Sequence, residues 1–129
     1  MKKVKHIALS LMLFATTNLL ANPVVVLSEN KADYTQTSTG YIVHFQLQAT
    51  AAELQSIEDL VAENPSVTMQ VELVQEGTYN IVYTVDHQNQ PEYVHKMMLS
   101  TGFQDVKYQG NDYDLNKVIE VIYFYQDQQ

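Results

Sequence analysis

Residues 41–62 read YIVHFQLQATAAELQSIEDLVA, and two hydrophobic periods meet in this stretch. In 41–48 every odd-numbered residue is apolar and most even-numbered residues are polar, which is typical of a strand with one buried face. In 54–61 the apolar residues recur at helical spacing. Between the two, Thr50 and Glu53 have the spacing of a capping box, in which each side chain accepts a hydrogen bond from the other residue's backbone N–H. The stretch therefore predicts a strand followed directly by a helix.

A hairpin and a second helix are predicted downstream. Residues 67–73 and 79–85 alternate in the same way on either side of a turn, so we expect an antiparallel hairpin. Pro91 suits the first position of a helix. Gly102 suits the left-handed position that ends a helix, with Phe103 folding back onto it.

Two more strands complete the predicted domain. Residues 106–108 predict a fourth strand, and 117–125, which read KVIEVIYFY, are rich in β-branched and aromatic residues and predict a fifth. The order over 41–125 is then β-α-β-β-α-β with an added C-terminal strand, which is the order of a ferredoxin-like fold. Because such crossovers are right-handed, we expect an α+β sandwich with two helices on one face of an antiparallel sheet.

The opposite face of that sheet should be solvated, because its residues are polar and carry little charge. The predicted members of this face are His44, Gln46, Gln48, Thr68, Gln70, Glu72, Asn80 and Thr84.

The chain begins with a predicted export signal. Residues 1–21 combine a lysine-rich start, an apolar core too short and interrupted for a membrane span, and a small residue at the end, which is typical of a secretory signal peptide. We therefore expect a periplasmic or secreted bacterial protein with no stable membrane span after cleavage. Residues 22–40 predict a short edge strand at 23–27 and a polar linker, and 126–129 form a polar tail.

Composition excludes several classes of function. The 129 residues include seven lysines, no arginine, fifteen acids and no cysteine, and the formal net charge is −8. Removal of the signal would leave four lysines against fifteen acids, which argues against nucleic acid as a partner because phosphate binding needs clustered cations. The absence of cysteine excludes disulfides and thiolate metal sites. With no glycine-rich phosphate loop and no nucleophile motif, we expect a non-enzymatic protein without a cofactor.

Residues 43–103 resemble a heavy-metal-associated domain, the copper-chaperone-like family. The resemblance is carried by 45–48, which match the first strand, by 64–67, which match the helix end before the second strand, and by 100–103, which match the final helix end with its glycine and aromatic residue. It implies the same ferredoxin-like fold.

The metal-binding loop of that family is missing from this chain. Its Met-x-Cys-x-x-Cys motif would fall on residues 50–55, where Ala52 and Gln55 occupy the two thiolate positions. Copper(I) prefers soft sulfur ligands, so neither residue replaces them. The resemblance therefore implies a degenerate domain that acts as a protein-interaction or binding module.

Two further resemblances suggest alternatives. Residues 40–43 and 77–81 are similar to strand starts in the cell-wall-binding repeats of bacterial division proteins, which implies a peptidoglycan-binding module. Residues 41–45 resemble the first strand of subtilisin-type pro-segments, which implies an intermolecular inhibitor or chaperone of a protease.

A metal-handling protein is another alternative, using His44, His87, His95 and Met98 as ligands. His95 and Met98 are three residues apart, which brings them together on one helix surface. Against this reading, methionines commonly fill core gaps, and His44 is expected on the sheet face away from the helices.

Tyrosines form the predicted ligand or partner surface, because they combine stiff stacking area with a polar tip that suits sugars and proteins. The alternative is that part of the set completes the core. The strand at 117–125 is apolar on both faces and could pair with a second copy of the chain as an edge strand. The tyrosines concerned are Tyr79, Tyr83, Tyr108, Tyr113, Tyr123 and Tyr125.

Overall fold

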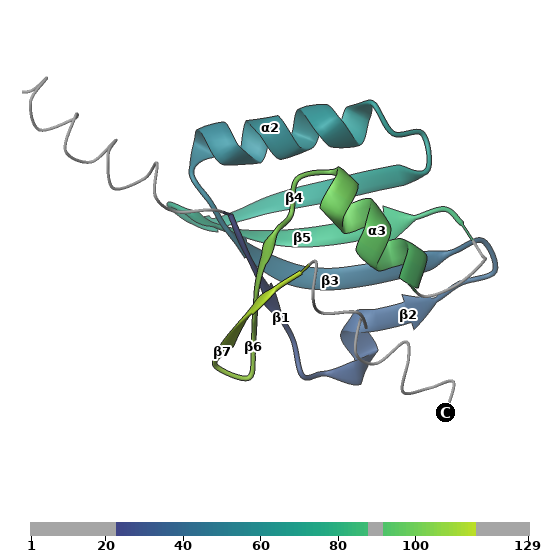
Figure 1. Ribbon diagram of the computed structural model, residues 1–129, viewed down its shortest axis with the longest axis horizontal. Helices are drawn as coiled ribbons and strands as arrows, with labels where there is room; N and C mark the ends of the chain where they lie inside the picture. Colours follow the sequence, from purple (N-terminus) through teal and green to yellow (C-terminus); the bar gives the residue numbers. More distant parts are fainter. Residues whose placement is uncertain (1–22, 88–91, 116–129) are drawn as a thin grey trace, which may run out of the picture.

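Seven strands form one mixed sheet in the computed structural model, which describes residues 23–87 and 92–115 (Figure 1). The order across the sheet is β4-β5-β3-β1-β6-β7, with β2 also paired to β3. The strands are β1 (Val24–Leu27), β2 (Tyr34–Gln36), β3 (Tyr41–Gln48), β4 (Val67–Gln75), β5 (Thr78–Val85), β6 (Asp105–Tyr108) and β7 (Asn111–Asp114). The helices are α2 (Ala51–Ala62), α3 (Glu92–Ser100) and the 3-10 turn η1 (Lys31–Asp33).

The predicted ferredoxin-like antiparallel sandwich is wrong, chiefly because of β1. This strand lies inside the sheet, antiparallel to β3 and parallel to β6, so the sheet is mixed. The side chains of Val25 and Leu27 are buried in the core. A four-residue apolar run carries no local signal that separates an edge strand from an interior one, so the sequence prediction placed it at the edge.

The predicted linker after β1 is also wrong. Residues 31–36 form η1 and β2, and β2 pairs with the first half of β3. Tyr34 is buried, and its hydroxyl donates to the backbone oxygen of Ser28 over 2.7 Å. One buried tyrosine therefore anchors a polar segment that has no hydrophobic period.

Signals carried by a few neighbouring residues were predicted correctly. Thr50 Oγ1 accepts from Glu53 N at 3.1 Å, and Glu53 Oε1 accepts from Thr50 N at 2.8 Å, which confirms the capping box of α2. At the end of α3, Gly102 has φ 104°, and Phe103 N donates to Met98 O at 3.0 Å. Together with the bond from Gly102 N to Leu99 O, this is a Schellman motif. The hairpin of β4 and β5 is confirmed as well.

The core lies between one sheet face and the two helices (Figure 1). We call this the inner face. Phe103 packs edge-on against Phe45 and Tyr83, with ring centroids 5.5 and 5.6 Å apart. The Tyr83 hydroxyl lies 2.7 Å from Thr101 Oγ1, and burial raises the pKa of this phenol. The pKa of Tyr41, also in the core, is raised for the same reason.

Three predictions fall outside the described residues: the signal peptide at 1–21, the strand at 117–125 and the tail at 126–129. Of the helices in the described ranges, none has the length and apolar character needed to cross a membrane. A hairpin partner for β6 is instead supplied by β7, which the sequence did not predict.

Candidate functional site

The sheet face opposite the helices, here called the outer face, carries a row of residues that crosses six strands. Pairing registers place Glu72 beside Asn80, Asn80 beside Gln46, and Gln46 beside Val26. The row continues through Lys107 to Asp112. Of the eight residues predicted for this face, seven are exposed and Thr84 is half-buried. The predicted polar face therefore exists, although the sheet around it differs from the predicted one.

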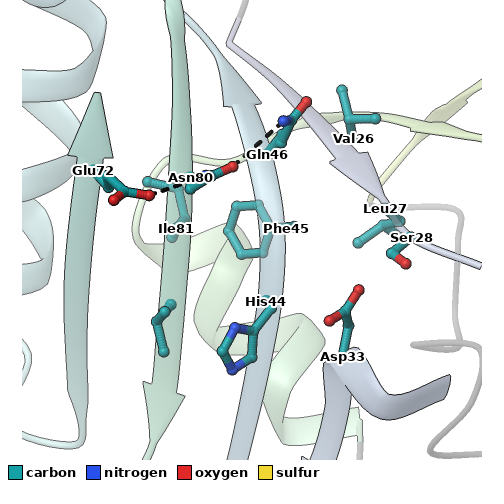
Figure 2. A pocket seen from close by; sticks show the side chains of 11 residues that line it. Val26, Leu27, Ser28, Asp33, His44, Phe45, Gln46, Glu72, Asn80 and Ile81 are labelled. Carbon is teal, nitrogen blue, oxygen red and sulfur yellow. Dashed lines mark hydrogen bonds between the residues drawn. The ribbon is translucent and has the colours of Figure 1, made fainter. Parts of the chain in front are cut away.

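Three side chains of the row are held in a fixed direction by hydrogen bonds. Gln46 Nε2 donates to Asn80 Oδ1 at 3.4 Å, and Asn80 Nδ2 donates to Glu72 Oε1 at 3.1 Å (Figure 2). An ionised carboxylate only accepts hydrogen bonds, so Glu72 sets the orientation of both amides. The carbonyl oxygen of Gln46 is consequently turned away from Asn80, as Figure 2 shows.

A break in strand pairing lies next to this row. On the side of β3 away from β5, the register of β1 covers residues 46–48 and that of β2 covers 41–43. Neither register reaches His44 or Phe45. The chain between β1 and β2, from Ser28 to Asp33, spans this gap and packs against β3 through η1. The interrupted pairing creates a notch in the middle of the outer face.

The notch opens into a hollow of about 470 Å³, here called the outer hollow (Figure 2). Asp33 from η1 and Ser28, which follows β1, form one wall, and the imidazole of His44 lies on the other side of β3, toward β5. Glu72 and Asn80 lie at the other side. The lining comprises Val26, Leu27, Ser28, Asp33, His44, Phe45, Gln46, Glu72, Asn80, Ile81 and Val82.

Aromatic side chains of the described strands all lie on the inner side of the sheet. Directly paired residues share a face, so each aromatic residue is placed by its partner. Tyr79 pairs with Leu47, and Tyr113 pairs with Val106, both of which are buried in the core. The same reasoning applies to the strand aromatics Tyr34, Tyr41, Phe45, Tyr83 and Tyr108. Within the described strands the outer face is therefore formed by amide, hydroxyl, aliphatic, imidazole and charged side chains, without aromatic rings.

The four predicted metal ligands do not converge. His44 is exposed on the outer face, whereas Met98 is buried in the core on the other side of the sheet. His87 stacks on Tyr93 with ring centroids 3.7 Å apart, and His95 is half-buried on α3. Across residues 23–87 and 92–115, no three histidine or acidic side chains are grouped so that they could hold a metal ion.

The predicted tyrosines do not form one exposed surface either. Tyr83 is fully buried, and Tyr79 and Tyr108 are half-buried against the core. Tyr113, at 43% exposure, is the most accessible of the four that the structure describes. Tyr123 and Tyr125 lie outside the described residues.

Sequence reasoning missed the contribution of Ser28 and Asp33, because both fall in the supposed linker. A local signal was present. Ser28 Oγ accepts from Asn30 N at 2.8 Å, and Asn30 Oδ1 accepts from Ala32 N at 3.0 Å, so the two side chains fold the segment into η1. Short polar side chains of this kind are typical turn and cap residues.

The two edges of the sheet differ in how they present their backbone. β7 is a four-residue strand, and two of its residues are aspartates. β4 has nine residues, and its Leu73 and Val74 are 65% and 47% exposed. Asp86 N donates to Ser66 O at 2.7 Å, so these two residues form a hydrogen-bonded pair. In an antiparallel ladder such pairs alternate with pairs whose backbone N–H and C=O groups point away from the partner strand. In β4 the residues whose backbone groups point away from β5 are therefore Val67, Met69, Val71 and Leu73.

Comparison with known proteins gives no family model, no curated protein and no solved structure that matches this chain.

Proposed function

We propose that this protein is a non-enzymatic binding module that engages its partner through the outer face, centred on the outer hollow. The observation that carries this proposal is the notch at His44 and Phe45, where two strands share one neighbour and leave a gap between them. Helices cover the inner face and leave the outer face open to a partner (Figure 1). The side chains around it are oriented in advance by the chain of bonds through Asn80.

A protein partner is favoured over a glycan. Sugars usually stack on exposed aromatic rings, and the aromatic residues of the described strands lie on the inner side of the sheet. The outer face instead offers amides, which pair well with peptide groups and polar side chains. We place this partner in the periplasm or outside the cell, in line with the export signal expected at residues 1–21.

The fold that the copper-chaperone resemblance implied is wrong, so this resemblance does not support a function. A metal-handling role is not favoured either, because His44 and Met98 lie on opposite sides of the sheet.

Site-specific photo-crosslinking in the producing cell tests the proposal. A photoreactive residue at Gln46, on the outer face, should give a defined adduct with the partner. The same residue at Ser56, which is exposed on α2, is the matched control and should give none. Adducts that form equally from Ser56, or that are absent from Gln46, would contradict binding through the outer face.

Pairing of two copies along β4 is a second candidate, favoured by the length of this edge and its outward backbone groups. The strand at 117–125, which the sequence predicted for such pairing, lies outside the described residues. Leu73→Lys would put a charge on the exposed edge and should convert a dimer to a monomer in sedimentation equilibrium. Leu60→Lys, at a 40% exposed position on α2, is the control. A chain that is monomeric before any substitution excludes this candidate.

A further inference from the structure

The outer hollow is distinguished by the charge of its lining. Its ionisable side chains are the carboxylates of Asp33 and Glu72 and the imidazole of His44, and it contains no lysine. Lys31, in the same 3-10 turn as Asp33, is exposed and not part of the lining. A cleft lined by one sign of charge concentrates ligands of the opposite sign. The hollow therefore attracts cations and repels anions.

A second hollow, at the β6–β7 end of the sheet, lacks this bias. It has a volume of about 490 Å³ and lies beside β6 and β7, where Lys107 Nζ is 3.8 Å from Asp112 Oδ1. Its carboxylates are thus partly offset by a lysine of the lining. The contrast shows that the acidic character of the outer hollow is local and is more than a reflection of the net charge of −8.

Hydrogen-bond direction gives a second, independent constraint. Donation runs from Gln46 to Asn80 and from Asn80 to Glu72, so the row ends on an acceptor and leaves the Gln46 carbonyl oxygen as a further acceptor. Asp33 adds two acceptor oxygens across the notch. These carbonyl and carboxylate oxygens favour a ligand that has several donors. Ammonium groups carry three donors and guanidinium groups five, and neither has an acceptor.

Aliphatic groups complete the hollow. Val26 and Val82 are half-buried members of the lining and stand on either side of the β3 residues His44 and Gln46. Such surfaces suit the methylene stem of a long cationic side chain, whose charged end can then reach the carboxylates.

We infer that the outer hollow binds a primary ammonium or guanidinium group, supplied by a lysine or arginine side chain of the partner. This deepens the proposed function and rests on it. The ligand's aliphatic stem lies against Val26 and Val82, and its donors reach Asp33. Glu72, on the opposite side of the hollow, adds to the negative potential. The exposed amides of Gln46 and Asn80 fix its orientation.

Nuclear magnetic resonance titration of the full chain tests this inference with defined probes. The probes are methylguanidinium, methylammonium, and blocked glycine pentapeptides with arginine, lysine or citrulline at the centre. Citrulline is the neutral isostere of arginine. We expect saturable amide shifts at His44, Gln46 and Asn80 with the cationic probes and none with citrulline. The free cations and the peptides separate a small-molecule ligand from a side chain: binding of methylguanidinium without binding of the arginine peptide would exclude a partner side chain as its source.

Charge variants supply the decisive control. Asp33→Asn and Glu72→Gln should each weaken binding of the arginine peptide about fivefold or more. Asp112→Asn removes the same charge from the far end of the same row and should leave the affinity within twofold. Equal effects of the three substitutions, or equal shifts with citrulline, would overturn the inference. If crosslinking at Gln46 succeeds while no cation binds, this inference fails and the proposed function stands. If crosslinking and cation binding both fail, the inference and the proposed function are both wrong.

Discussion

Successive residues of β3 point to the inner and the outer face in turn, and the two faces differ in burial and in packing. Phe45 is 5% exposed and packs against two aromatic rings, whereas its neighbour Gln46 is exposed and bonded only to another amide. Burial of apolar area is the main source of stability, so the inner face holds the fold together. The outer face contributes little to that balance. Its residues are consequently free to be selected for what they bind.

The largest expected effect is on the inner face. Phe103→Ala removes a fully buried ring that touches two others, so it should lower the free energy of unfolding by about 3–5 kcal/mol. Urea denaturation followed by circular dichroism measures this change. A loss below about 1 kcal/mol would show that the aromatic cluster is not the centre of the core.

Alkaline pH should also act through the inner face. Burial raises the pKa of Tyr83 above that of the unfolded chain, so the stability it contributes is complete below about pH 10 and falls as pH rises further. Each tyrosine with a raised pKa adds up to about 1.4 kcal/mol per pH unit to the decrease in the free energy of unfolding. Unfolding free energies measured between pH 9 and pH 11.5 should fall less steeply in Tyr83→Phe. Tyr41, whose pKa burial also raises, should contribute to the slope that remains, and an unchanged slope would contradict the role of Tyr83.

A smaller effect is expected at the start of α2. Thr50→Ala removes one half of the capping box, so it should cost about 1 kcal/mol of unfolding free energy. Thr50→Ser keeps the hydroxyl and is the control, with most of the stability retained. If both variants are equally unstable in thermal melts, the hydroxyl is not the stabilising group.

The smallest effect on stability is expected on the outer face. Gln46→Ala should change the free energy of unfolding by less than about 0.5 kcal/mol, because the side chain is exposed and its bond to Asn80 is long. The same substitution should weaken binding of the arginine peptide without abolishing it. A large loss of stability would show that the two faces are not divided between folding and binding.

Local signals account for what the sequence predicted correctly. Thr50 with Glu53, and Gly102 with Phe103, act over four or fewer residues, so their structures can be read directly from the chain. The alternation in 41–48 likewise assigned the two faces of β3. These features also survive in a fold other than the predicted one.

What could not be predicted depends on residues far apart in the chain. The position of β1 is set by its pairing with β6, and nothing in residues 24–27 encodes that partner. The same error hid half of the candidate site, because Asp33 reaches the outer hollow only when β1 ends beside β3. Residues 28–40 were wrongly predicted to be a linker because β1 was wrongly predicted to lie at the edge of the sheet.

The interior position of β1 also constrains the order in which the protein can assemble. Val24 lies beside Asp105, so β1 has to wait for a segment far downstream in the chain before its second side is paired. Contacts of such long sequence separation slow folding. Until Tyr108 has been synthesised, one side of β1 remains an open template for other strands, which exposes the incomplete chain to unwanted strand pairing.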